Sequence, residues 1–310
     1  MASTFCCCLV AVSLAADFPL SLTLPHKWGE RIGCCSSALL RKSTMTAEYK
    51  RSDGGESAAV AFCAMPQNIY DNPEFFARYD RMRTAQSGLN EVLEQPVFRS
   101  LLPDVTGLRV LDMGCGAGET CRWLVEQGAQ SVVGVDVSER MLAKAMALPD
   151  PKIEYMRSAA EDLKFADASF DLVVSSLMFH YIDDLRSVLA RIRRWLAPGG
   201  RLLFSTEHPM FTAAHGLFAD RWTRDENGNL EAWKVDGYLD EGKRVSTWFV
   251  DGVVRYHRTV STLINSLIDT GFRITRVLEP HADEEAERRV AYLLEERKAP
   301  TFIFIVAEAV

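Results

Sequence analysis

The chain has 310 residues, 48% of them hydrophobic and 25% charged, which is the composition of a globular protein large enough for one large domain or two small ones. The net charge is −7 and no tract is dense in Lys or Arg, which argues against a nucleic-acid backbone as a partner. Six of the eight cysteines precede residue 65, in a spacing that fits neither a disulfide framework nor a zinc site. We therefore expect reduced thiols, no bound metal and an intracellular protein.

Residues 1–64 differ in composition from the rest of the chain. They are rich in Ser, Ala and Cys, and only two acidic residues precede Met45, as in plastid or mitochondrial transit peptides. Residues 5–16 form an apolar stretch like that of a secretory leader, but it lacks a basic start and is too short to span a bilayer. The segment can equally be an untargeted, disordered extension of a cytoplasmic protein, or sequence upstream of a true start at Met45 or Met65. All these interpretations place a boundary near Met65 and predict a domain over 65–310.

From residue 105 the pattern alternates between strands and helices, which predicts an α/β fold with a parallel sheet. The expected strands are 108–113, 132–135, 170–175 and 201–206, followed by a reversed hairpin of strands 272–278 and 301–307 that closes the sheet. The expected helices are 118–127, 139–148 and 259–270, and one that begins near Leu185 and is stopped by Pro198, Gly199 and Gly200.

Residues 209–258 do not fit this alternation. They are rich in aromatic side chains, and two apolar runs, 245–250 and 253–257, flank Asp251 and Gly252, a strong signal for a two-residue hairpin turn. We interpret 209–258 as an inserted substrate cap. Its aromatic residues either line an apolar pocket or simply pack the cap on the sheet; they are Phe211, Phe218, Trp222, Trp233, Tyr238, Trp248, Phe249 and Tyr256.

Three glycines, Gly114, Gly116 and Gly118, lie between the first strand and the first helix of this pattern. Such a loop lets the backbone approach a ligand closely and directs helix N-terminal amides toward it. The spacing does not match a dinucleotide fingerprint, which makes a nicotinamide-dependent oxidoreductase a poor alternative. Asp136 ends the second strand, where its carboxylate can accept hydrogen bonds from two ribose hydroxyls.

The segments VLDMGCGAGET, VVGVDVS, AAEDLKF, FDLVVSSLMFHYIDD and WLAPGGRLLFSTEHP resemble, in order and spacing, the motifs of class I S-adenosylmethionine-dependent methyltransferases. The resemblance covers 65–310 and is closest to a bacterial-type group acting on small molecules. It implies a Rossmann-like, doubly wound, seven-stranded, mostly parallel sheet, with S-adenosylmethionine as cofactor. It assigns cofactor contacts to the following residues, although many relatives have Asp in place of Ala159: Asp112, Gly114, Cys115, Gly116, Gly118, Asp136, Val137, Met141, Ala160, Glu161 and Ser175.

Residues 65–95 resemble the lid helix that covers the cofactor in this family, with Tyr79 and Arg83 on one face. The simpler interpretation is an amphipathic surface helix. At the acceptor side, His208 follows the strand 201–206, and His180 follows the strand 170–175. Both lie at carboxyl ends of strands, where ligands bind in such sheets, so we take them as candidate catalytic residues. A lone His is more often structural than catalytic.

The leading hypothesis is methyl transfer to a small-molecule acceptor, without nucleic acid and without stable membrane insertion. The alternative is a chain that still binds S-adenosylmethionine but has lost catalysis and serves as an assembly or regulatory factor, since fold and function separate readily. The sequence identifies neither the acceptor, nor the atom that is methylated, nor the oligomeric state.

Overall fold

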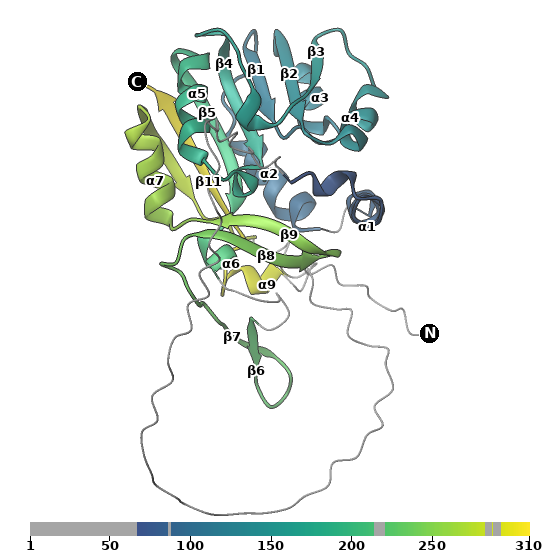
Figure 1. Cartoon of the computed structure of the whole chain (residues 1–310), viewed down its shortest axis with the longest axis vertical. Helices are drawn as coiled ribbons and strands as arrows, with labels where there is room; N and C mark the ends of the chain where they lie inside the picture. The colour runs from purple at the N-terminus through teal and green to yellow at the C-terminus, as the bar shows by residue number, and fades with distance from the viewer. Residues whose placement is uncertain (1–66, 86–87, 214–220, 283–286, 288–292) are drawn as a thin grey trace, which may run out of the picture. The chain divides into compact units, whose positions relative to one another are not determined.

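The computed structural model describes residues 67–85, 88–213, 221–282, 287 and 293–310, so the predictions for residues 1–64 lie outside the described residues. A seven-stranded sheet has the order β10-β11-β5-β4-β1-β2-β3, and β11 runs antiparallel to the other six strands. The predicted α/β, doubly wound fold with a reversed C-terminal hairpin is therefore confirmed (Figure 1). The strand order reverses between β1 and β4, which opens a crevice at their carboxyl ends.

The sheet strands are β1 (Arg109–Met113), β2 (Ser131–Asp136), β3 (Ile153–Arg157), β4 (Phe170–Ser176), β5 (Leu196–Glu207), β10 (Phe272–Leu278) and β11 (Phe302–Ala309). The helices around the sheet are α2 (Gln95–Leu101), α3 (Glu119–Glu126), α4 (Glu139–Met146), α5 (Leu185–Trp195) and α7 (Val260–Asp269), and the short α9 (Leu293–Glu296) precedes β11. The sequence pattern did not assign β3. It also began β5 too late, because the strand starts at Leu196, directly after α5.

Helices cover both faces of the sheet, and alternate strand residues supply the two cores. On one face, Leu111 and Val173 pack with buried residues of α5 and α7 such as Leu189 and Leu267. On the other face, Val110 and Leu172 belong to a second cluster with residues of α2, α3 and α4. The strands are thus fixed from both sides, so their carboxyl-terminal residues are held in defined positions.

The N-terminal described segment forms a short 3-10 helix, η1 (Ile69–Asp71), then α1 (Pro73–Thr84) and a π-helix, η2 (Asn90–Glu94). Helix α1 begins sharply because the Asn72 side chain accepts from the backbone N–H groups of Glu74 and Phe75, and Pro73 occupies the first turn. Phe75 packs with Ile69 of η1 and Val253 in a small separate core. Helix α1 is therefore fixed against a segment nearly 180 residues further along the chain.

The inserted segment contains α6 (Pro209–Ala213) and two hairpins, β6 (Trp222–Arg224) with β7 (Leu230–Trp233) and β8 (Gly242–Trp248) with β9 (Val250–His257). The hairpin predicted around Asp251 and Gly252 exists, but the predicted turn is wrong. Trp248 pairs with Val250, so the chain reverses at Phe249, which has φ 62°. Asp251 and Gly252 instead form a bulge opposite Thr247, whose hydroxyl donates to Asp251.

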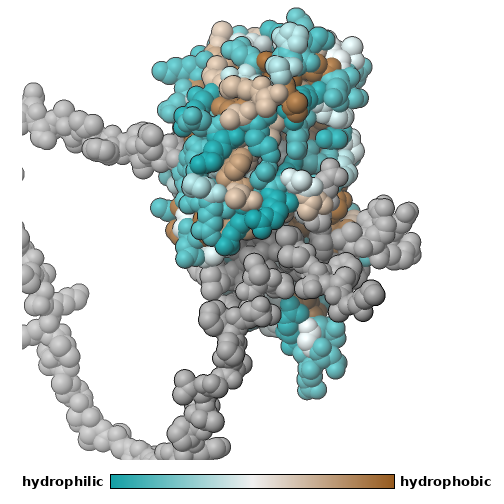
Figure 2. Space-filling model, turned by 90° about the vertical axis from the view of Figure 1, so that its right-hand side faces the viewer, coloured by the Kyte–Doolittle hydropathy of each residue, from teal (hydrophilic) through white to brown (hydrophobic). Residues whose placement is uncertain are grey.

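Hydrophobic residues occur in small separate groups among hydrophilic ones on the face shown in Figure 2. No helix within the described residues is long and apolar enough to cross a membrane. Among these residues there is also no group of three His, Cys, Asp or Glu side chains that could hold a metal ion.

Candidate active site

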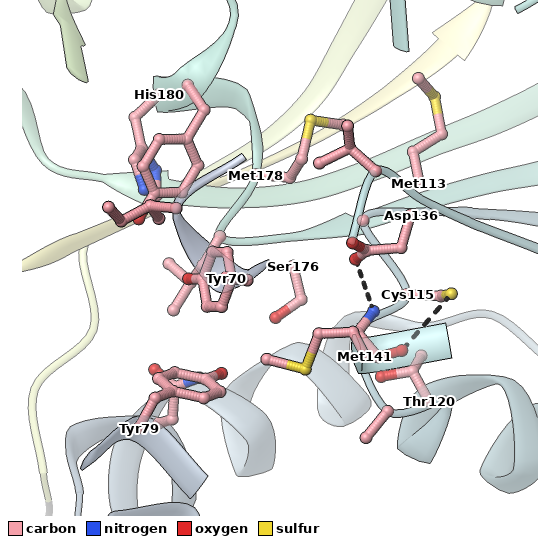
Figure 3. Close-up of a pocket in the computed structure, with 18 of the residues that line it drawn as sticks. Tyr70, Tyr79, Met113, Cys115, Thr120, Asp136, Met141, Ser176, Met178 and His180 are labelled. Atoms are coloured by element: carbon pink, nitrogen blue, oxygen red, sulfur yellow. Dashed lines mark hydrogen bonds between the residues drawn. The ribbon is translucent and has the colours of Figure 1, made fainter. Parts of the chain in front are cut away.

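A pocket lies at the carboxyl ends of the central strands. The last residues of β1, β2, β4 and β5 all line it: Met113, Asp136, Ser176 and Glu207. Residues of η1 and α1 line it as well, and they include Tyr70 and Tyr79. In Figure 3, Asp136 and His180 lie on opposite sides of the view, with Tyr70 and Ser176 between them.

The glycine loop and Asp136 form one end of the pocket. Oδ2 of Asp136 accepts from the backbone N–H of Gly116 at 2.9 Å, and Oδ1 accepts from that of Ser138 at 2.8 Å. Burial raises the pKa of Asp136, while these backbone hydrogen bonds oppose the rise. Because a carboxylate oxygen has more than one lone pair, both oxygens can still accept a hydrogen bond from a diol.

Gly116 has φ 53°, and no atom lies within 4 Å of the position a Cβ would take there. Since Gly116 lines the pocket, that position faces open space, which leaves room for a ligand against the loop backbone.

Asp112 lies next to this loop and is completely buried. Its Oδ2 accepts from the Cys121 thiol at 3.1 Å. Burial raises the pKa of Asp112 to about 7, the thiol hydrogen bond lowers it, and the charge of Asp136 raises it. A buried carboxylate without a cation favours a ligand that brings a positive charge.

Helix α1 closes the pocket from another side. The Arg83 guanidinium pairs with Glu91 at 2.6 Å and with Glu119 at the start of α3. Arg83 and Tyr79 both line the pocket, as their shared helix face predicts. Burial raises the pKa of Tyr79 to about 12, so it is a neutral phenol. Lys144 of α4 also pairs with Asp80 of α1, so α1 is tied to α3 and α4 at once.

A second tie joins the segment before α1 to the start of α4. The Asp71 carboxylate accepts from the Ser138 hydroxyl at 2.6 Å and from the backbone N–H groups of Glu139 and Arg140 at 3.2 and 3.1 Å. Asp71 therefore caps the N-terminus of a helix 67 residues later in the chain. Next to it lie Val137 and Met141, which line the pocket together with Ala159, Ala160 and Glu161.

A family model described as a methyltransferase domain matches residues 111–204. An S-adenosylmethionine-dependent methyltransferase from Mesorhizobium loti has a solved structure that is 42% identical, covers 71% of this chain and 100% of its own, and has a TM-score of 0.66. The structure of a protein assigned to the same family, from Listeria monocytogenes, is 36% identical over 69% of this chain and 97% of its own, with a TM-score of 0.62. An uncharacterized Haemophilus influenzae protein is 34% identical over 220 residues, 69% of this chain and 86% of its own length.

This chain belongs to the S-adenosylmethionine-dependent methyltransferases. Its cofactor is S-adenosylmethionine, and the resemblance drawn from its motifs is confirmed. The pocket end built by Asp112, Gly116 and Asp136 fits S-adenosylmethionine. Asp112 offers a carboxylate to the ammonium group, Asp136 offers one to the ribose diol, and the Gly116 backbone leaves open space between them.

The other end of the methyltransferase pocket contains His180, which is 5% exposed. The backbone N–H of Glu207 donates to His180 Nδ1 at 3.4 Å, and the Thr206 hydroxyl lies 3.3 Å from the same atom. Burial lowers the pKa of His180 to about 4, with the Glu207 carboxylate opposing the shift. The ring is therefore neutral, and because Nδ1 accepts, its hydrogen is on Nε2.

Three predicted site residues do not line the pocket. His208 is directed elsewhere: its Nε2 pairs with Glu279 at 2.8 Å, and its Nδ1 accepts from Met210 N–H. The Ser175 hydroxyl donates to the Met113 carbonyl inside the sheet, and the neighbouring Ser176 faces the pocket instead. Gly118 is the N-cap of α3, with φ 74°.

The structure also adds residues to which the sequence assigned no contact, namely Gln95, Ser176, Met178 and Glu207 in the lining and Glu94 behind it. Of the aromatic residues in 209–258, only Phe211 and Trp248 line the pocket among those described, and Phe218 lies outside the described residues. Trp222 and Trp233 pack edge to face at 5.1 Å, which supports the packing interpretation for them.

Proposed function

We propose that this methyltransferase acts on a small molecule that enters the pocket between Tyr70, Tyr181 and Trp248 and places its nucleophile near Ser176 and His180. The observation that carries the proposal is the continuity of one pocket from Asp136 to His180. Its two ends have different chemistry: Asp112 and Asp136 lie at one, and aromatic side chains, the neutral His180 and the Glu207 carboxylate lie at the other. Such a buried space suits a small acceptor.

The methyl group of S-adenosylmethionine is already activated at a sulfonium, so the protein mainly aligns the acceptor and excludes water. We assign the cofactor end to Asp112, Gly114, Cys115, Gly116 and Asp136. The adenine side has Val137, Met141, Ala160 and Glu161, and Tyr79 and Arg83 close it from α1.

At the acceptor end, Nε2–H of the neutral His180 donates a hydrogen bond to the acceptor and so orients it. Its low pKa makes a general-base role unsuitable near neutral pH. The domain over 65–310, with 65–95 as a lid and 209–258 as a cap, is part of the same proposal. Residues of both segments line the pocket, which supports these roles.

The cofactor half is tested by calorimetric binding of S-adenosylmethionine and S-adenosylhomocysteine to the full chain. Asp136→Ala should weaken both by at least about tenfold, because hydrogen bonds to a charged group are worth about 1.5–3 kcal/mol. Asp171→Ala is the matched control, since Asp171 accepts from Arg109 away from the pocket. Equal losses in the two variants would contradict the assignment.

The acceptor half is tested by formation of S-adenosylhomocysteine in His180→Ala and His208→Ala. His180→Ala should lower turnover and leave cofactor affinity nearly intact, because the ring faces the acceptor end. His208→Ala should lower the thermal midpoint but not turnover per folded molecule, because its partner is Glu279. The reverse pattern would restore His208 as the catalytic candidate.

A further inference from the structure

Glu94 is a buried acid that the proposed function does not use. It ends the π-helix η2 and has 0% exposure. None of the ion pairs between described residues includes Glu94, so its charge is stabilised first by hydrogen bonds, with a smaller contribution from the charge of Arg83. An unpaired buried carboxylate is costly, and a π-helical turn often marks a functional site. The buried carboxylate and the π-helical turn both indicate a functional role for Glu94.

The hydrogen bonds of Glu94 lead to the pocket wall. Oε1 accepts from the Ser176 hydroxyl at 2.9 Å and from the Ser205 hydroxyl, and Oε2 accepts from Gln95 Nε2 at 2.9 Å. Ser176 and Gln95 both line the pocket, whereas Glu94 and Ser205 stand behind it. Of these two lining residues, Ser176 has the hydroxyl group, so it is the one that can pass a proton between the pocket and the buried carboxylate.

The direction of these hydrogen bonds leaves Ser176 free to accept one more. Its hydrogen points to Glu94, and one of its lone pairs accepts from Gln95 Nε2 at 3.2 Å. A hydroxyl has two lone pairs, so one remains for a donor in the pocket. Ser176 also lies two positions beyond Val174, the β4 residue paired with Asp112, and so stands between the cofactor end and His180.

We propose that Glu94 and Ser176 form a proton relay, and that the acceptor is accordingly a molecule whose nucleophilic atom carries a hydrogen, as in a hydroxyl or N–H group. The inference rests on the proposed function. The acceptor donates its hydrogen to Ser176 Oγ while Ser176 passes its own to Glu94 Oε1. The new bond joins the acceptor atom to the methyl carbon, the sulfur–methyl bond breaks, and sulfur keeps the electron pair. A methylated acceptor, S-adenosylhomocysteine and a neutral Glu94 result.

The surroundings of Glu94 suit a proton acceptor. Burial raises its pKa, and the hydrogen bonds from Ser205, Ser176 and Gln95 oppose the rise. Arg83 is the charged group that acts on it, and it too lowers the pKa. A raised pKa makes the carboxylate a better base near neutral pH. Turnover should therefore rise with pH as Glu94 loses its proton and then reach a plateau.

The test measures S-adenosylhomocysteine formation by the full chain with four probes. The nucleophilic atom of phenol and of aniline carries a hydrogen, and that of benzoate and of N,N-dimethylaniline does not. We expect methylation of a probe with the hydrogen, and a loss of about 10²-fold in Glu94→Gln and Ser176→Ala. Glu94→Gln should also lose the rise of turnover at low pH, here called the low-pH limb, and Glu94→Asp should retain it. Ser205→Ala, which removes a Glu94 hydrogen bond behind the wall, should only move that limb to higher pH.

Calorimetric binding of S-adenosylhomocysteine and the thermal midpoint show whether each variant is folded. Methylation of benzoate or N,N-dimethylaniline alone would overturn the relay, as would a Glu94→Gln protein with the wild-type pH profile. If Glu94→Gln unfolds, Glu94→Asp and Ser176→Ala decide by the same profile. A wild-type protein that binds S-adenosylmethionine and methylates none of the four probes contradicts the small-molecule proposal itself, and the relay falls with it.

Discussion

Replacing Asp112 by Asn should stabilise the protein and weaken its cofactor binding at the same time. The Asp112 carboxylate is completely buried, and burial raises its pKa to about 7 from an ordinary value of 3.8. The folded protein therefore holds the proton more tightly than the unfolded chain. Below pH about 4, Asp112 does not lower the free energy of unfolding. The destabilisation grows as the pH rises and reaches its full size above pH about 7.

The size of the effect follows from that shift of about three pKa units, each equivalent to 1.36 kcal/mol, which gives about 4 kcal/mol at pH 8. Asn removes the charge and can keep a contact with Cys121. The free energy of unfolding should thus rise by up to about 4 kcal/mol at pH 8 and by less at pH 5. Affinity for S-adenosylhomocysteine should fall by about 10- to 100-fold, because a hydrogen bond between charged groups is lost.

Urea unfolding at pH 5 and 8 and calorimetric binding measure the two effects. Asp171→Asn is the control of opposite sign. The hydrogen bond from Arg109 lowers the pKa of Asp171, so this variant should lose stability at both pH values. The reasoning fails if Asp112→Asn is no more stable than the wild type at pH 8, or if its gain does not grow between pH 5 and pH 8.

The remaining predictions concern the loop and the N-terminal cap. Asp71→Asn should lower the free energy of unfolding by about 1–2 kcal/mol in urea, because the charge at the start of α4 is lost; no change would contradict the capping role. Gly118→Ala should destabilise by at least about 1–3 kcal/mol, since its φ is 74° and a Cβ would lie 2.2 Å from the Tyr155 hydroxyl. Gly116→Ala should change stability less but weaken S-adenosylmethionine binding in calorimetry, because its Cβ would enter the open pocket; equal stability losses in the two glycine variants would refute this contrast.

The part of the fold that the sequence predicts best is the part set by local chemistry. The glycine loop and Asp136 at the end of β2 each depend on a few neighbouring residues. Strand β3 was missed because Ile153–Arg157 is short, lies at the sheet edge and has only partly buried or exposed side chains, which gives no continuous apolar run. The Phe249 turn was missed because Asp251 and Gly252 serve equally well in a bulge.

The acceptor half of the site could not be read from local patterns. Glu94 and Ser176 are 82 residues apart, and only the packing of η2 against the sheet brings them together. The two histidines both follow strands, but β4 borders the strand reversal, whereas β5 is followed on its other side by β11. The backbone of His208 donates to the Thr301 carbonyl just before β11, and its ring turns toward Glu279. Sequence position alone does not distinguish these neighbours.

The Asp71 cap has a practical meaning for fragments of this protein. The segment that matches the family model, residues 111–204, contains the glycine loop and the whole of β2 and β4, yet it lacks Asp71, Tyr79 and Arg83. A fragment cut to that segment would leave the first amides of α4 without their carboxylate and the pocket without one wall. A fragment of this chain that keeps the cofactor end enclosed should therefore begin no later than Asn68, whose side-chain amide donates a hydrogen bond to Asp71.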